Sequence, residues 1–196
     1  MLNPNLAPLD HYTFARLNEM LDGIMPEANE SPILFSLGEP QKTTPKILSE
    51  TISLNNHLWN RYPPPNGDEE FRKAAAGWLK RRYGLPDNFL DPEVHIMPVP
   101  GTREPLYQIG FLCTPPEKNG ERPAILMPNP FYHVYQGAAM LGGAEAVYLS
   151  AERQNNFFPS LDDISADLFA RTAVFFLCSP ANPQGTVASR DYIKKA

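Results

Sequence analysis

The chain has 196 residues, of which 42% are hydrophobic and 20% charged, so we expect a folded globular protein of one domain or slightly more. It carries 17 Lys and Arg against 22 Asp and Glu, and this acidic balance argues against nucleic-acid binding through phosphate contacts. Two cysteines are too few for a disulfide framework or a zinc site, and no apolar run approaches the ~18 residues of a membrane span. The start of the chain does not resemble a secretion signal. We therefore expect a cytoplasmic protein with no metal site, no nucleic-acid partner and no membrane segment.

In the first half of the chain, the pattern of apolar residues predicts mainly helices. In chain order the expected elements are a helix over 10–23, a strand over 33–37, a helix over 45–55, a loop over 60–67 and a helix over 68–83. These helices are predicted from apolar residues at helical spacing. The helix over 68–83 has the strongest pattern, because acidic residues begin it, basic residues end it and Gly84 follows as a C-cap.

From residue 94 onward, short apolar runs alternate with helical segments. The expected strands are 94–99, 124–127, 146–149 and 173–178, and the expected helices are 102–112, 130–140, 161–169 and one that begins at Ser189. The run 173–178 is apolar throughout, which is typical of a strand buried on both faces of a parallel sheet. This alternation predicts an α/β fold in which helices cover both faces of a parallel sheet. Because the series of units stops abruptly, we expect the chain to be a fragment of a longer protein.

Ligands of open α/β sheets bind at the carboxyl ends of the strands, so the residues that follow the expected strands are the candidate binding residues. Gly101 and Thr102 open a helix, and the first N–H groups of a helix suit an anion such as phosphate. Tyr132 can stack on a flat ring, and the amide of Asn182 can donate to an oxygen. Each residue also has a structural interpretation, as a helix start, a core aromatic and an Asx turn. Together they favour a phosphorylated aromatic ring that bears an oxygen.

Five short motifs occur in order along the chain: Gly38-Glu39-Pro40, Tyr62-Pro63 with Gly67, Gly101-Thr102-Arg103-Glu104, Asn129-Pro130-Phe131-Tyr132 and Asn182-Pro183-x-Gly185. This order resembles the pyridoxal-phosphate-dependent class I/II aminotransferases of fold type I, over essentially the whole chain but only the amino-terminal half of the family's pattern. The resemblance implies the α/β/α sandwich of the family's large domain, incomplete at its carboxyl end. Residues 1–40 would form an N-terminal arm and the start of the small-domain and active-site segment, and 41–196 part of the large cofactor-binding domain.

The resemblance also implies which residues hold the cofactor, pyridoxal 5'-phosphate. Gly101, Thr102 and Arg103 would bind its phosphate, mainly through backbone N–H groups at the helix start. Tyr132 would stack on the pyridine ring, and Asn182 would hydrogen-bond the oxygen at its 3-position.

Two further roles and one absence follow from the same resemblance. Tyr62 would reach the phosphate of the neighbouring subunit, which implies a homodimer, and Gly38 would lie against the α-carboxylate of the substrate. The family's Schiff-base lysine lies in a Ser-x-Ser-Lys segment, which this sequence does not contain. No catalytic residue is therefore assigned, and we expect the 196 residues alone to be inactive.

Within the family, the residues of these motifs are most similar to those of the succinyldiaminopimelate aminotransferases of lysine biosynthesis. That similarity implies amino transfer between N-succinyl-LL-2,6-diaminopimelate and 2-oxoglutarate. Two alternatives remain open at this point. One is an aminotransferase for another amino acid, such as aspartate, alanine or an aromatic; the other is a non-catalytic α/β fragment that binds a phosphorylated ligand.

Overall fold

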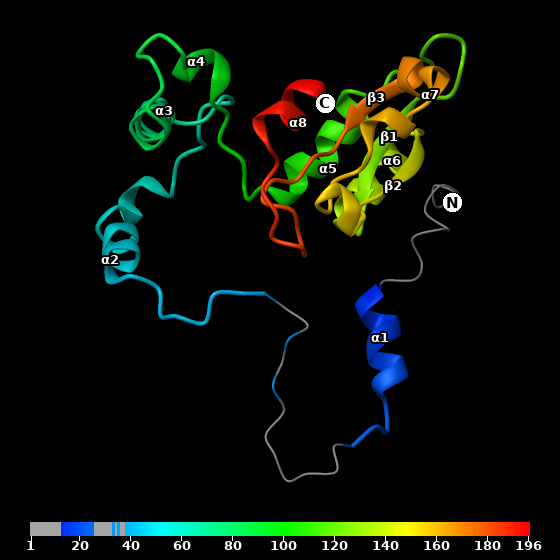
Figure 1. Ribbon diagram of the computed structural model, residues 1–196. Coiled ribbons are helices and arrows are strands. Elements are labelled where there is room, and N and C mark those ends of the chain that lie inside the picture. Colours follow the sequence, from blue (N-terminus) through cyan, green and yellow to red (C-terminus); the bar gives the residue numbers. More distant parts are fainter. Residues whose placement is uncertain (1–12, 26–32, 34, 36–37) are drawn as a thin grey trace, which may run out of the picture. The chain divides into compact units, whose positions relative to one another are not determined.

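The computed structural model describes residues 13–25, 33, 35 and 38–196 (Figure 1). The chain divides into two compact units, one made of residues up to Leu21 together with Val99–Ala196 and the other of Asp22–Pro98. The expected division at residue 40 concerns the domains of the whole family fold and stays a prediction. Within the described ranges, no helix is long and apolar enough to cross a membrane.

The unit Asp22–Pro98 is built from helices. They are α2 (Lys46–Leu54), the 3-10 turn η2 (Asn56–Leu58), α3 (Glu69–Tyr83) and α4 (Pro92–His95). The helix expected over 68–83 is confirmed as α3, where the Asp68 carboxylate accepts two backbone N–H groups and Gly84 ends the helix in the left-handed conformation. The helix expected over 45–55 is confirmed as α2.

The strand expected over 33–37 lies mostly outside the described part of the chain. Of the strand expected over 33–37, the structure describes only Ile33 and Phe35; neither lies in a strand, and both side chains are exposed, so no sheet covers them. The other three residues lie outside the described part of the chain.

The strand expected over 94–99 is wrong. The Asp91 carboxylate caps a backbone N–H two residues on at 2.9 Å, and Pro92 takes the first helical position, so the chain turns into α4 instead. Beyond α4, Pro98 and Pro100 have no N–H to donate to a neighbouring strand. The apolar residues of this segment therefore lack the backbone donors that a strand needs.

The other unit contains the sheet and the remaining helices. Its elements are α1 (Thr13–Leu21), α5 (Arg103–Leu112), β1 (Ala124–Asn129), α6 (His133–Leu141), β2 (Glu145–Ser150), η3 (Arg153–Asn155), η4 (Leu161–Asp163), α7 (Ala166–Arg171), β3 (Thr172–Phe175) and α8 (Arg190–Lys195). Of the helix expected over 10–23, Thr13–Leu21 form α1, and residues 10–12 lie outside the described part of the chain. The other helices expected here are confirmed, the one over 161–169 as η4 and α7. Helix α8 begins after Ser189, whose hydroxyl accepts the N–H of Tyr192 at 3.1 Å.

The three strands form a parallel sheet in the order β2-β1-β3 (Figure 1). Across β1 and β2, Asn129 pairs with Ser150, and across β1 and β3, Leu126 pairs with Phe175. The expectation that 173–178 is buried on both faces is wrong: β3 is shorter and only half-buried, because it has a neighbour on one side among the described strands. Strand β1 takes the fully buried central position, since its first four residues are 2% exposed or less.

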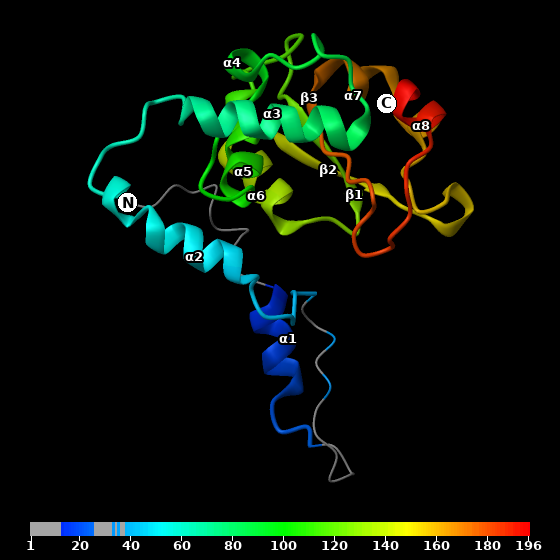
Figure 2. The same cartoon turned by 90° about the vertical axis from the view of Figure 1, so that its left-hand side faces the viewer.

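Helices α5 and α6 pack against each other over the sheet face that carries Ile125 and Met127. Figure 2 shows the two helices on the same side of the strands. Their closest approach is at Gly110 of α5, where an added Cβ would lie 2.3 Å from the Cβ of Ala138 in α6. A glycine is therefore required at this crossing, because any side chain would push the helices apart.

Replacing Gly110 with Ala should lower the free energy of unfolding by about 1–3 kcal/mol, the usual range for overpacking a well-packed contact. Chemical denaturation with urea measures the change. The matched control is Gly77→Ala in α3, where the new Cβ would meet only the flexible end of Arg81 at 3.3 Å. Because Ala is the better helix former, this control should be neutral or stabilising by up to about 1 kcal/mol. Equal effects of the two substitutions would contradict the close helix crossing.

Candidate functional site

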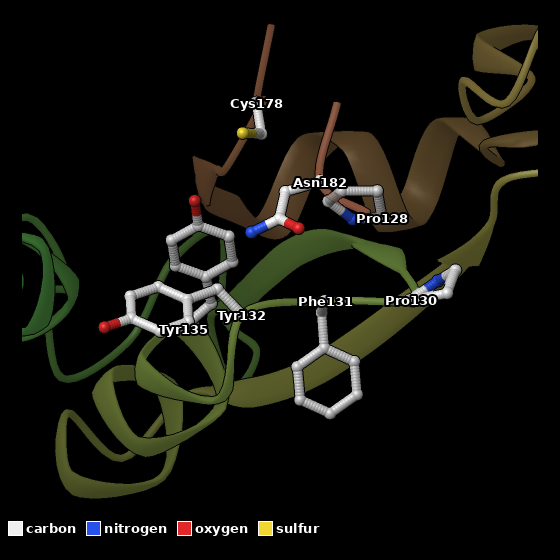
Figure 3. Close-up of a pocket in the computed structure, with 7 residues that line it drawn as sticks. All are labelled: Pro128, Pro130, Phe131, Tyr132, Tyr135, Cys178 and Asn182. Atoms are coloured by element: carbon white, nitrogen blue, oxygen red, sulfur yellow. The ribbon is translucent and has the colours of Figure 1, made fainter. Parts of the chain in front are cut away.

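A pocket of about 150 Å³ opens where β1 and β3 end, at the carboxyl edge of the parallel sheet (Figure 3). Seven residues line it: Pro128, Pro130, Phe131, Tyr132, Tyr135, Cys178 and Asn182. Five come from the end of β1 and the start of α6, and two from the segment after β3. The pocket lies where an open α/β sheet is expected to bind its ligand.

Two tyrosines form an aromatic wall of this pocket. Tyr132 is the residue before α6, and its ring meets the ring of Tyr135 edge-on, with centroids 5.7 Å apart and planes at 88°. Tyr135 is 7% exposed and stacks face to face on Phe176, with centroids 4.1 Å apart and planes at 7°. The stack anchors Tyr135 in the core, and Tyr135 in turn supports the ring of Tyr132.

The Tyr135 hydroxyl stays protonated at neutral pH. Burial raises the pKa of Tyr135, and the neighbouring Cys178 and Tyr132 raise it further. The group can therefore act as a hydrogen-bond donor beside the pocket. Tyr135 and Cys178 line the pocket although neither was a predicted site residue. Their signals in the sequence are the spacing of three residues between Tyr132 and Tyr135 and the position of Cys178 just after β3.

Asn182 lies on a tight turn after β3. The N–H of Gly185 donates to the Ala181 carbonyl and the N–H of Ala181 donates to the Thr186 carbonyl, both at 2.7 Å, so backbone hydrogen bonds close the turn around Asn182. Figure 3 shows its side-chain amide across from the two tyrosine rings. The structure thus brings together Tyr132 and Asn182, which the sequence placed at the ends of two separate strands.

The turn that opens α5 approaches the same pocket through one side chain. The Nε of Arg103 donates to the Tyr132 hydroxyl at 2.9 Å. Gly101 has a φ of +101°, which favours glycine, and its N–H donates to the Val99 carbonyl at 2.8 Å. The carboxylate of Glu104 lies at this helix start, where the helix dipole favours negative charge. Glu104 therefore already supplies one negative charge at the start of α5.

His133, the first residue of α6, lies beside the same cation. Partial burial lowers the pKa of His133, and the Arg103 guanidinium lowers it further. Its ring also meets the Tyr132 ring edge-on, with centroids 4.7 Å apart. His133 is therefore expected to be neutral at pH 7, and its pKa reports the position of Arg103.

Tyr62 and Gly38 belong to the other compact unit, Asp22–Pro98. Both are exposed, Tyr62 fully, and an added Cβ at Gly38 would have no atom within 4 Å. Their roles stay predictions, because nothing relates their positions to the pocket.

The loop that carries Tyr62 is fixed by Arg72 of α3. Arg72 is 4% exposed, and its guanidinium donates to both carboxylate oxygens of Glu93 at 2.7 and 2.8 Å. It also donates to the carbonyls of Asn66 and Gly67, the last residues of the loop. One buried cation thus ties the loop to both α3 and α4.

Residues 31–196 match the family model of aminotransferase class I and II. The chain belongs to this family. The resemblance stated from the motifs is confirmed, and so is the expected α/β fold with a parallel sheet. Class I and II aminotransferases are pyridoxal-phosphate-dependent enzymes.

Individual relatives agree with the family assignment. The LL-diaminopimelate aminotransferase of Dehalococcoides mccartyi strain 195 is 30% identical over 197 residues, which is 100% of this chain and 48% of that protein. The crystal structure of an aminotransferase from Neisseria meningitidis has a TM-score of 0.90 and 37% identity, over 99% of this chain and 48% of that one. The crystal structure of aminotransferase AspB from Helicobacter pylori has a TM-score of 0.81 and 30% identity, over 95% of this chain and 48% of that one. The chain spans about half the length of these aminotransferases.

Replacing Glu93 with Ala should lower the free energy of unfolding by about 2 kcal/mol, because it leaves the buried guanidinium of Arg72 without its carboxylate. Urea denaturation measures the change. Lys73→Ala is the control, since it breaks the exposed pair between Lys73 and Glu69 on the same helix and should leave the free energy of unfolding unchanged within error. If the Glu93 variant were as stable as the control, the pair between Arg72 and Glu93 would not stabilise the fold.

Proposed function

We propose that the complete protein containing these residues is a pyridoxal-phosphate-dependent aminotransferase and that the pocket between β1 and β3 holds the cofactor ring. One observation carries this proposal. Tyr132 and Asn182 face one pocket at the carboxyl ends of two adjacent parallel strands, in a chain that belongs to the aminotransferase family. An aromatic surface and an amide donor are what a flat ring bearing an oxygen requires.

The side chains and backbone groups around the pocket fit the chemistry of this cofactor. Pyridoxal phosphate supplies an electron sink for amino-group chemistry when it is bound. Tyr132 would offer a stacking surface to the ring, Asn182 would donate to the ring oxygen, and the protonated Tyr135 would be a further donor. The phosphate would be held at the start of α5 by Gly101, Thr102 and Arg103: the helix dipole and the N–H groups of Thr102 and Arg103 favour an anion, and Gly101 would let it approach the backbone.

The remaining site residues are part of the same proposal. Tyr62 would reach the phosphate of a neighbouring subunit in a homodimer, a role that its full exposure on a fixed loop allows. Gly38 would let the α-carboxylate of the substrate approach the backbone, which the open space around it allows. We place the enzyme in the cytoplasm, which two free thiols, Cys113 and Cys178, are consistent with.

For the substrates, we propose N-succinyl-LL-2,6-diaminopimelate as amino donor and 2-oxoglutarate as acceptor. Two features support a donor with the diaminopimelate skeleton. The residues of the sequence motifs resemble those of the succinyldiaminopimelate aminotransferases. Several relatives at 30–33% identity are named LL-diaminopimelate aminotransferase. The succinylated form is the finer part of the proposal, since those relatives are named for the unmodified amino acid.

Tyr132→Ala and Asn182→Ala should each weaken the binding of pyridoxal phosphate by about tenfold, through loss of a stacking surface and of one hydrogen bond. Titration of the complete protein with the cofactor, followed by absorbance, gives the dissociation constants. Phe169→Ala and Asn155→Ala are matched controls, since both residues are exposed and neither lines the pocket. Unchanged binding in both pocket variants would contradict the proposed location of the cofactor.

The substrate assignment is tested by amino-transfer rates of the complete protein with 2-oxoglutarate and a panel of donors. We expect the highest kcat/KM with N-succinyl-LL-2,6-diaminopimelate and lower values with LL-diaminopimelate, aspartate, alanine and phenylalanine. A preference for unmodified LL-diaminopimelate would overturn the succinylated donor and keep the skeleton. A preference for one of the other amino acids would overturn both.

A further inference from the structure

The hydrogen bond between Arg103 and Tyr132 joins the start of α5 to the residue that precedes α6. The donor is the guanidinium Nε, the acceptor is the phenol oxygen, and they are 2.9 Å apart. Arg103 comes directly after Gly101 and Thr102, so the turn proposed to hold the phosphate also carries the side chain that contacts the proposed stacking ring. The family resemblance assigned Arg103 a contact with the phosphate, mainly through the backbone, and no contact with Tyr132.

The Tyr132 ring is held by core packing and by this bond. The ring is half-buried against the hydrophobic core, and its neighbours His133 and Tyr135 meet it edge-on at 4.7 and 5.7 Å between centroids. Edge-on contacts of this kind restrain the rotation of the ring about its own long axis. The hydroxyl lies on that axis, so a charged donor there restrains the direction in which the side chain points, and hydrogen bonds to a charged group are stronger than neutral ones.

Two further features hold Arg103 where it can do this. The close contact of α5 and α6 at Gly110 and Ala138 holds the two helices against each other. The guanidinium also lies close enough to His133 to contribute to its lowered pKa, after the larger effect of burial. Arg103 therefore lies beside the start of α6, next to the rings of Tyr132 and His133.

We propose that Arg103 is a positioning residue whose side chain holds the Tyr132 side chain in the direction in which its ring can stack on a flat ligand ring. Phosphate binding at the start of α5 and ring stacking at the start of α6 are then coupled through one side chain. The consequence for cofactor binding rests on the proposed function, whereas the orientation of Tyr132 does not.

The first test needs no cofactor. In the complete protein labelled with ¹³C at the tyrosine Cζ atoms, Tyr132→Phe identifies the Tyr132 signal by its disappearance. Arg103→Gln should shift this signal, because the phenol oxygen loses a charged donor, and should raise the pKa of His133 in an NMR titration. Arg153→Gln, at an exposed arginine of η3, is the control and should change neither. An unshifted Tyr132 signal in Arg103→Gln would overturn the proposal.

The second test is a double-mutant cycle on the dissociation constant of pyridoxal phosphate. Arg103→Gln and Tyr132→Phe should each weaken binding by about tenfold, and the double variant should also be about tenfold weaker, because both remove the same hydrogen bond. A double variant about a hundredfold weaker would overturn the coupling. If Tyr132→Ala weakens binding and Arg103→Gln does not, this inference fails alone; if Tyr132→Ala also has no effect, the proposed function fails as well.

Discussion

The burial of β1 on both faces is the constraint on which the site depends. Its first four residues are 2% exposed or less, and β2 and β3 flank it in parallel. Parallel neighbours bring their carboxyl ends to the same edge, so the segments after β1 and β3 must meet there. Tyr132 and Asn182 share a pocket for this reason, although they are far apart in the sequence. A change that displaced β1 would separate the ring from the amide without touching either residue.

Much of the fold could be predicted because local signals and burial agree. The run 124–127 is apolar on both faces and forms the central strand, and the caps at Asp68 and Gly84 define α3. The segment 94–99 shows the opposite case. Its apolar residues suggest a strand, but the capped helix start at Asp91 and the prolines that follow remove the backbone geometry and donors that a strand requires.

Only the site residues that come shortly after a strand could be predicted from the sequence. Tyr132 and Asn182 were found in this way, and the pocket contains both. The contact between Arg103 and Tyr132 could not be found, because it exists only once α5 and α6 pack together. Tyr135 could not be assigned to the site from the sequence, because a tyrosine at helical spacing is equally typical of a core residue. In the structure Tyr135 belongs to the hydrophobic core and also lines the pocket.

The crossing of α5 and α6 leaves room for a single methyl group between positions 110 and 138. Ala138 fills that room, and Gly110 leaves it open. An added Cβ at 110 would also lie 3.0 and 3.1 Å from the backbone C and Cα atoms of Ala138, so removing the methyl group at 138 alone would not make room for it. Only a change in the spacing of the two helix backbones could therefore accommodate a side chain at position 110.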